Sequence, residues 1–301
     1  MIKNYLKTPQ ANFAKRPLKA ALIILFLLTL QQAQSQSIPL INGFAHNDYR
    51  HRHPLFDALD NGYTNIEADI FLRRGKLIVA HIDPYFKKHH TLEALYLKPL
   101  ADRIAANNGQ VYRGYNTPII LMIDVKSNSD STYAALRPLL EKYKSILSAY
   151  NHGSASQGAV TIVLSGHKPY KMIKSEDDRF AFIDEDLRKT NQDTATTGVY
   201  KMASCKYSKL LKWSGKGMMP DQEEKKLCAF VAIAHKFGEK VRLWASPEND
   251  KVWTALLKCG VDLINTDKLV TLKNFLNGRK SPVAISANNA ANDDDSGVLS
   301  L

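Results

Sequence analysis

Two carboxylates interrupt an apolar segment of the sequence. Glu67 and Asp69, in "NIEADIFL", are two residues apart, so in a strand their side chains would point the same way. Asp124 and Lys126 share this spacing at the end of a second apolar run, "PIILMIDVK". Burying unpaired carboxylates is costly, and a hard divalent cation bound by Glu67, Asp69 and Asp124 would offset that cost. Because all the ligand atoms would be oxygens, we expect Mg²⁺ or Ca²⁺ rather than Zn²⁺.

Ion pairs are the simpler alternative for the same carboxylates. Glu67 and Asp69 could be neutralised by Arg73, Arg74 or Lys126. Two such carboxylate-bearing strand ends, together with two histidines at neighbouring strand ends, favour a metal site over a set of ion pairs.

Several other polar or aromatic residues follow apolar runs. His46, in "AHND", and His81, at the end of "KLIVAH", are candidate general acid and base because imidazole titrates near neutral pH. Lys126 could stabilise charge on a phosphoryl oxygen. Trp244, in "KVRLWAS", could line the pocket or be a core aromatic, and His167, in "LSGHKP", is a further candidate for the site.

The elements that would position these residues alternate between strand-like and helix-like segments. The expected strands cover residues 40–46, 64–72, 76–81, 118–126, 159–166, 179–187, 198–204, 240–246 and 261–267. The expected helices cover residues 54–62, 91–109, 131–147 (with Pro138 as a kink or break), 221–238, 248–260 and 268–278. This rhythm indicates a parallel sheet with crossover helices, and about eight core strands in about 250 residues predict an α/β fold of the (β/α)8 TIM-barrel type. A doubly wound open sheet is the alternative. In a barrel the strand ends converge on one face, where active sites lie.

The first 35 residues have a different composition. An apolar run, "ALIILFLLTL", is followed by the small residues Ala33 and Ser35. The run is preceded by the basic residues Lys3, Lys7, Lys15, Arg16 and Lys19. This layout predicts a signal peptide over 1–35 and a periplasmic or extracellular protein; the alternative, an uncleaved anchor, would need about 20 apolar residues. We expect the barrel over 36–280 and a disordered tail over 281–301.

Charge and cysteine content narrow the function further. The formal net charge is +12, and removal of the five basic residues of the leader leaves about +7. Without a dense Lys/Arg block we expect no nucleic-acid partner, whereas a mild positive field favours anionic substrates such as phosphates. Cys205, Cys228 and Cys259 are too few for a disulfide framework; one bridge could form, but we expect buried free thiols.

The sequence resembles the glycerophosphodiester phosphodiesterase superfamily, which comprises phospholipase-C-like phosphodiesterases on a TIM barrel. It is most similar to the branch named for altered inheritance of mitochondria. The resemblance spans about residues 40–276. It depends on "HNDYR" (46–50), "PLFDAL" (54–59), "IEAD" (66–69), "LYLKPL" (95–100), "VRLWAS" and "LLKCGVDLINTDKL" (256–269).

The resemblance implies roles for the residues already noted. His46 and His81 match the two catalytic histidines of the family, and Glu67 and Asp69 match its first two metal ligands. Asp124 lies where the glycerophosphodiesterases usually have glutamate. The spider-venom phospholipases D of the superfamily have aspartate there, with lysine two residues on, as in "IDVK". The family's lysine therefore corresponds to Lys126.

One position departs from the family pattern. The usual arginine after the first histidine contacts phosphate, but this sequence has Asn47. We therefore expect the phosphate contact to pass to Arg50 or Lys126, or the substrate to differ. Asn47, Arg50, Lys126 and Trp244 are the expected substrate-binding residues.

The expected function is a metal-dependent phosphoric diester hydrolase that acts on small-molecule or lipid phosphodiesters, such as glycerophosphodiesters or phospholipid head groups. Transient contact with a membrane surface stays open, as do the oligomeric state and the choice between hydrolysis and cyclising transfer. The alternative is a non-catalytic exported barrel that binds a phosphorylated lipid head group or sugar. A metal-dependent hydrolase of another ester or amide would favour a histidine-rich metal cage, which this carboxylate set is not.

Overall fold

The computed structural model of this protein describes residues 37–82, 90–190, 192 and 198–280. The expected signal peptide (1–35) and the expected tail (281–301) lie outside the described residues, as does His89 in the segment after the hairpin. Among the described residues, none of the helices combines the length and the apolar character that crossing a membrane requires.

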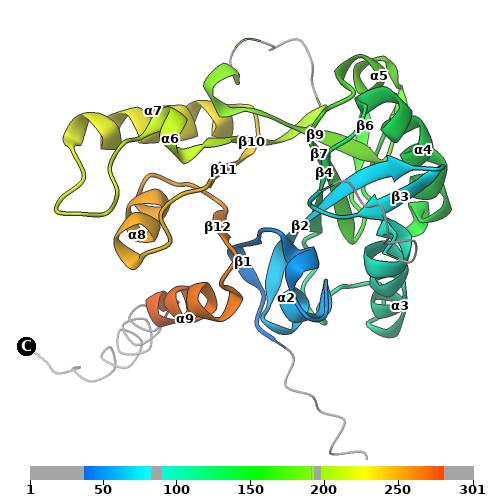
Figure 1. The fold of residues 1–301 in the computed structure, drawn as a ribbon, viewed down its shortest axis with the longest axis horizontal. Coiled ribbons are helices and arrows are strands. Elements are labelled where there is room, and N and C mark those ends of the chain that lie inside the picture. Colours follow the sequence, from blue (N-terminus) through cyan, green and yellow to red (C-terminus); the bar gives the residue numbers. More distant parts are fainter. Residues whose placement is uncertain (1–36, 83–89, 191, 193–197, 281–301) are drawn as a thin grey trace, which may run out of the picture. The chain divides into compact units, whose positions relative to one another are not determined.

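Eight parallel strands form a barrel (Figure 1). In spatial order they are β11 (Lys240–Trp244), β10 (Tyr200–Lys206), β9 (Ala181–Asp186), β7 (Val160–Gly166), β4 (Ile119–Val125), β2 (Tyr63–Arg73), β1 (Leu40–Ala45) and β12 (Ile264–Thr266). A parallel bridge between Arg242 and Leu263 joins the β11 and β12 ends and so closes the ring. The predicted (β/α)8 barrel is confirmed, and the doubly wound alternative is wrong.

Helices follow most barrel strands, as expected. They are α2 (Phe56–Asp60), α3 (Lys98–Ala106), α4 (Ser129–Lys142), α5 (Tyr170–Ser175), α6 (Tyr207–Leu210), α7 (Asp221–Lys236), α8 (Asp250–Lys258) and α9 (Leu269–Lys280). A π-helical turn, η2 (Glu93–Leu97), leads into α3, and short 3₁₀ turns occur at η1 (Asp48–Arg50), η3 (Lys144–Ile146) and η4 (Leu187–Lys189). Pro138 lies inside α4, which continues past it to Lys142, so the helix does not break there.

A β-hairpin extends one barrel strand beyond the ring. β3 (Lys76–Val79) pairs antiparallel with β2, as predicted. Arg74 and Gly75 form the turn with φ angles of 48° and 73°. Both residues are left-handed, as hairpin turns require, and glycine adopts this conformation without strain. The returning chain donates a hydrogen bond from Ala80 N to Asp69 O at 3.1 Å. The hairpin therefore brings the residue after Ala80 back to the carboxyl end of β2.

The barrel interior changes from apolar to polar along the strands. Met122 and Asp124 lie on the same side of β4, as Met202 and Ser204 do on β10, because side chains alternate along a strand. The buried apolar cluster comprises Phe44, Ile120, Met122, Val163, Met202 and Leu263. Polar side chains therefore lie nearer the carboxyl ends of the strands, as the barrel prediction requires.

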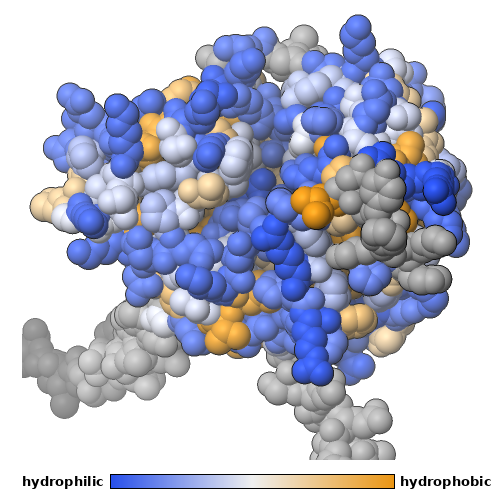
Figure 2. Space-filling view, in the orientation of Figure 1, coloured by the Kyte–Doolittle hydropathy of each residue, from blue (hydrophilic) through white to orange (hydrophobic). Residues whose placement is uncertain are grey.

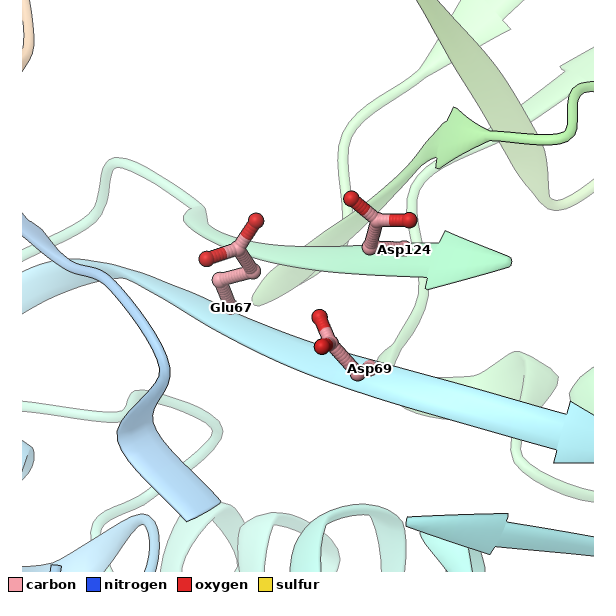
Figure 3. Close-up of side chains that lie close together, drawn as sticks. All are labelled: Glu67, Asp69 and Asp124. Carbon is pink, nitrogen blue, oxygen red and sulfur yellow. The ribbon is translucent and has the colours of Figure 1, made fainter. Parts of the chain in front are cut away.

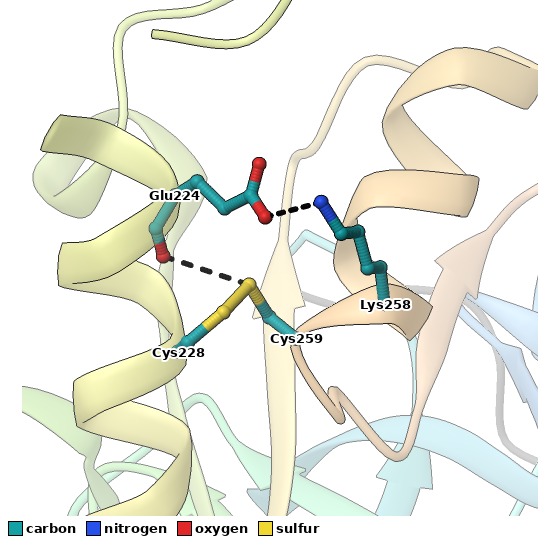
Figure 4. The surroundings of a disulfide bond; sticks show 4 residues. All are labelled: Glu224, Cys228, Lys258 and Cys259. Carbon is teal, nitrogen blue, oxygen red and sulfur yellow. Dashed lines mark hydrogen bonds and ion pairs between the residues drawn. A yellow bond between two sulfur atoms is a disulfide. The ribbon is translucent and has the colours of Figure 1, made fainter. Parts of the chain in front are cut away.

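Two features were not predicted. A small antiparallel sheet is formed by β5 (Ala149–Asn151), β6 (Ser154–Ser156) and β8 (Asp178–Arg179). A disulfide joins Cys228 on α7 to Cys259 at the end of α8, where the Cα atoms are 4.6 Å apart (Figure 4). The expectation of free thiols is therefore wrong for this pair, because the consecutive helices α7 and α8 bring the two cysteines together, and it is confirmed for the buried Cys205. On the face shown in Figure 2, hydrophilic residues predominate and apolar residues gather in small patches.

Candidate active site

A cavity of about 520 Å³ opens at the carboxyl ends of the barrel strands. Its lining includes six lysine or arginine side chains and five carboxylates. The predicted residues that line it are His46, Asn47, Glu67, Asp69, His81, Asp124, Lys126 and Trp244. One cavity thus receives side chains from β2, β4 and β11 and from the chain that follows β1 and β3.

The three predicted metal ligands lie together (Figure 3). Asp69 on β2 is in register with Asp124 on β4, and Glu67 precedes Asp69 on the same side of β2. One carboxylate oxygen from each residue lies within 4.8 Å of the other two. Oxygens bound to one Ca²⁺ or Mg²⁺, each at about 2.0–2.6 Å, are separated by comparable distances. The position and chemistry of this set fit a divalent cation.

Two cations lie beside the carboxylates. Lys126 Nζ is 3.4 Å from Asp69 Oδ2 and 3.2 Å from Asp124 Oδ1, so the ion pair between Asp69 and Lys126, considered as the alternative to a metal site, is present. Burial lowers the pKa of Lys126, but Asp124 and Asp69 outweigh it and raise that pKa overall. Arg242, almost fully buried, lies 3.7 Å from Glu67 Oε1. The three carboxylates and these two cations together carry a net charge of minus one. A bound divalent cation would change this net charge to plus one.

His46 is held by a carboxylate on the last barrel strand's carboxyl end. Its Nδ1 lies 2.6 Å from Asp267 Oδ1, and its Nε2 lies 3.5 Å from Glu67 Oε2. Burial lowers the pKa of His46, but the hydrogen bond with Asp267 and the charge of Glu67 outweigh burial and raise it. The same hydrogen bond lowers the pKa of Asp267. Asp267 therefore orients the ring so that Nε2 faces the carboxylate cluster.

His81 is held in a comparable way by Asp69. Its Nδ1 lies 3.0 Å from Asp69 Oδ2 and 3.1 Å from the Tyr49 hydroxyl. That hydroxyl is 2.7 Å from Asp69 Oδ2, and burial together with Asp69 raises the pKa of Tyr49 far above its ordinary value. Tyr49 therefore stays protonated and a hydrogen-bond donor. The His81 side chain is 51% exposed, which leaves its Nε2 accessible from the cavity.

The residues after His46 have separate roles. Asn47 adopts a left-handed conformation (φ 51°), and its backbone N–H donates to Glu67 Oε2 at 3.2 Å. Asp48 is buried away from the cavity lining and accepts hydrogen bonds from Leu55 N (2.6 Å) and the Tyr96 hydroxyl (2.8 Å). Arg50 is exposed on η1 and does not belong to the cavity lining.

Of the two further candidates, Trp244 lies in the cavity lining and His167 does not. Trp244 is 39% exposed and lines the cavity, so it is a wall residue rather than a core aromatic. His167 is outside the lining, and its Nδ1 lies 2.9 Å from the Ser127 carbonyl oxygen.

Sequence reasoning missed three residues of the site. Asp267 ends "LINTD" after the last barrel strand, so the strand-end argument could have identified it. Arg242 lies within the apolar run of β11, two residues before Trp244, and this spacing signals the same side of the strand. Tyr49 carries no comparable signal. Further cavity residues that were not predicted are Ser165, Gly166, Lys168, Asp184, Asp186, Arg188, Ser204, Cys205, Lys206 and Lys209.

Comparison with known proteins places the chain in a family. The model of the AIM6-like phosphodiesterase domain matches residues 32–184, and the model of the glycerophosphoryl diester phosphodiesterase family matches residues 240–269. Altered inheritance of mitochondria protein 6 of Eremothecium gossypii is 28% identical over 267 residues, which cover 77% of this chain and 68% of that protein. The Kluyveromyces lactis protein of the same name is 26% identical over 314 residues, covering 81% and 74%.

A solved structure is also similar. The crystal structure of a glycerophosphodiester phosphodiesterase from Parabacteroides distasonis aligns with a TM-score of 0.49 at 14% identity, over 81% of this chain and 98% of that chain. The family match spans the strands and turns that carry His46, His81 and the three carboxylates. The chain therefore belongs to the AIM6-like phosphodiesterase family.

Proposed function

We propose that this protein is an exported, metal-dependent phosphoric diester hydrolase that acts on glycerophosphodiesters or phospholipid head groups. One observation carries the proposal: two histidines, each held at Nδ1 by an aspartate, border a cluster of three carboxylates in one cavity. Membership of a phosphodiesterase family is consistent with this chemistry.

The two histidines would perform the proton transfers. One imidazole Nε2 takes a proton from the nucleophile, which is water or a substrate hydroxyl beside the phosphate. The nucleophile's oxygen forms a bond to phosphorus as the bond from phosphorus to the leaving oxygen breaks. The other imidazole gives its proton to the leaving alkoxide. Water yields a phosphomonoester and an alcohol, whereas a substrate hydroxyl yields a cyclic phosphate and an alcohol.

The charges around the cluster suit a phosphodiester. A divalent cation held by Glu67, Asp69 and Asp124 would stabilise the charge that develops on the phosphoryl oxygens. With Lys126 and Arg242 nearby, that cation would change the local net charge from minus one to plus one. A phosphodiester carries one negative charge and would neutralise it.

Lys126 and Arg242 are the proposed phosphate contacts in this chain. The family's usual arginine position holds Asn47, whose side chain lies 2.9 Å from His46 Nδ1 and 3.3 Å from Asp267 Oδ1. Arg50, the other candidate, lies outside the cavity lining. Lys126 and Arg242 both line the cavity, and each lies within 4 Å of a carboxylate of the cluster.

A substrate screen tests the proposal against the non-catalytic alternative. Purified mature protein is incubated with Mg²⁺ or Ca²⁺ and with glycerophosphodiesters, lysophospholipids or sphingomyelin. Release of alcohol that requires the metal and disappears in His81→Ala supports the hydrolase. Tight binding of a phosphorylated head group without turnover would instead support an exported binding protein.

Export rests on separate observations. The basic leader and its apolar run predict a cleaved signal peptide, and the Cys228–Cys259 disulfide is compatible with an oxidising compartment. The mature protein should begin near residue 36. N-terminal sequencing of native material that begins at Met1 would contradict export by cleavage.

A further inference from the structure

The side of the cavity opposite the carboxylate cluster is cationic. In the eight-stranded ring β10 lies opposite β2, and β11 lies opposite β4. Lys206 ends β10 and Trp244 ends β11, and both line the cavity. Lys209, three residues after Lys206, lines it too. The carboxylates of the proposed metal and phosphodiester site therefore face a wall that carries positively charged side chains.

The cations of this wall are not equally available. Arg188 is paired with Asp186, with Nε 2.9 Å from Oδ1. Lys168 donates to the Asp184 carbonyl oxygen at 2.6 Å. Among the described residues, Lys206 and Lys209 have neither a carboxylate within ion-pair distance nor a hydrogen bond from the ammonium group. Lys168 also keeps its charge, but its ammonium group is held by the β9 backbone, so Lys206 and Lys209 are the two cations of this wall that are free to bind a ligand.

Trp244 supports one of these lysines. Lys206 Nζ lies 5.7 Å from the centre of the Trp244 ring, within the range of a cation–π contact. The contact holds the Lys206 ammonium group against the Trp244 ring, which lines the cavity, and does not neutralise its charge. Lys209 is exposed beside it on α6 and makes no hydrogen bond to any described residue. A charged group that enters the cavity would therefore meet two unneutralised ammonium groups.

We infer that the preferred substrate carries a second anionic group, a phosphomonoester or a carboxylate, on one of its two alcohols, and that Lys206 and Lys209 bind it. This rests on the proposed function, because the carboxylate side must hold the diester. A cavity of about 520 Å³ has the size of a small-molecule site and accommodates more than a phosphate group. Discrimination would arise from the second anion, since the diester itself is common to all candidate substrates.

The test compares two diesters that differ only in this group: glycerophosphoglycerol and glycerophosphoglycerol with a terminal phosphate. We expect wild-type kcat/KM to be at least tenfold higher for the phosphorylated diester. In the double variant Lys206→Gln/Lys209→Gln this preference should fall to less than threefold. The matched control is Lys225→Gln/Lys236→Gln, which removes two exposed lysines of α7 outside the cavity lining and should keep the full preference.

A second arm presents the same two head groups on diacyl lipids in phosphatidylcholine vesicles. Comparing it with the soluble diesters shows whether the substrate is a soluble diester or a membrane lipid. A preference that depends on Lys206 and Lys209 in either arm supports the inference and identifies the source. A preference seen only on vesicles and kept in the double variant would reflect surface charge and would overturn the inference. Equal wild-type turnover of both diesters would overturn it while leaving the proposed hydrolase intact.

Failure of the hydrolase itself has a different signature. If neither diester is turned over, calorimetric binding of the two compounds decides the inference. Tenfold tighter binding of the phosphorylated diester, lost in Lys206→Gln/Lys209→Gln, would support it for a binding protein. Equal affinity of both compounds for wild type would overturn it.

Discussion

His46 Nδ1 lies 2.6 Å from Asp267 Oδ1, although 221 residues separate them in the sequence. The barrel makes this contact because its first and last strands pair in parallel, with Ala45 in register with Thr266. The carboxylate fixes the proton on Nδ1 and leaves Nε2 for proton transfer, the arrangement by which carboxylates orient catalytic histidines. Asp267 would thus position His46 in the proposed reaction.

Asp267→Asn should lower kcat by roughly tenfold or more, since loss of an orienting carboxylate commonly has effects of this size. KM should change little, and the ¹⁵N shifts of the His46 ring should report a changed tautomer or a changed pKa. Asp262→Asn is the matched control, because Asp262 accepts a similar bond, at 2.8 Å, from His235 outside the cavity. Unchanged His46 spectra in Asp267→Asn would remove the positioning role.

His46→Ala and His81→Ala should each lower kcat at least about a hundredfold with the fold intact, because general acid–base groups commonly contribute 10²–10⁴-fold. If both act on one proton-transfer path, the double variant should be little worse than the poorer single variant. Steady-state kinetics with circular dichroism as the folding check measures this. His235→Ala is the control and should retain nearly full activity. Near-wild-type turnover in either cavity variant would defeat the assignment.

Glu67→Gln, Asp69→Asn and Asp124→Asn should each weaken binding of Mg²⁺ or Ca²⁺ at least tenfold, because each removes an anionic ligand. Titration calorimetry on the metal alone measures this without reference to catalysis. Asp102→Asn is the control, since Asp102 pairs with Lys98 on the exposed side of α3. Wild-type affinity in all three cluster variants would show that the cation binds elsewhere.

Loss of the Cys228–Cys259 disulfide should lower the free energy of unfolding by about 3.5 kcal/mol, from the chain entropy of a loop of this length. The sequence separation is 31 residues. Cys228→Ser, Cys259→Ser and the double variant should lose similar amounts, because each breaks the same bond. Urea unfolding with and without a reductant measures the effect. A reductant that destabilises the double variant as much as wild type would contradict this explanation.

A buried acidic pair should make stability depend on pH. Burial and the neighbouring carboxyl group of Glu185 raise the pKa of Glu239 from 4.5 to about 9. The folded protein then keeps a proton that the unfolded chain loses, so the free energy of unfolding should fall as pH rises from 4.5 toward 9. Glu239→Gln should flatten this fall, whereas Glu141→Gln, at an exposed ion pair, should not. Equal pH dependence in wild type and Glu239→Gln would refute the linkage.

The strand-end residues could be predicted from sequence because a parallel barrel brings all its strand ends to one face. Glu67, Asp69 and Asp124 follow from this rule together with the two-residue period of a strand. His81 follows from the hairpin, whose turn residues are explicit in "RRGK". These predictions needed only local pattern and one topological assumption.

The remaining features depend on which distant segments meet. The contact of Asp267 with His46 requires that the barrel close between β12 and β1, and no local pattern states the register. The disulfide requires, beyond the neighbouring positions of the consecutive helices α7 and α8, that Cys228 and Cys259 face one another. The spacing of Arg242 and Trp244 indicates a shared side of β11, but only the closed barrel shows that Arg242 lies 3.7 Å from Glu67 and 4.3 Å from the centre of the Phe44 ring.

The measurement that tests the central claim most directly is ³¹P NMR of a glycerophosphodiester incubated with purified protein, before and after metal removal. The account predicts that the diester signal converts to a phosphomonoester or a cyclic phosphate, stops converting in chelator and resumes when Mg²⁺ or Ca²⁺ is restored. Asp124→Asn and His46→Ala should show at most about a hundredth of the wild-type rate. Undiminished conversion in chelator, or conversion by both variants at the wild-type rate, would contradict it.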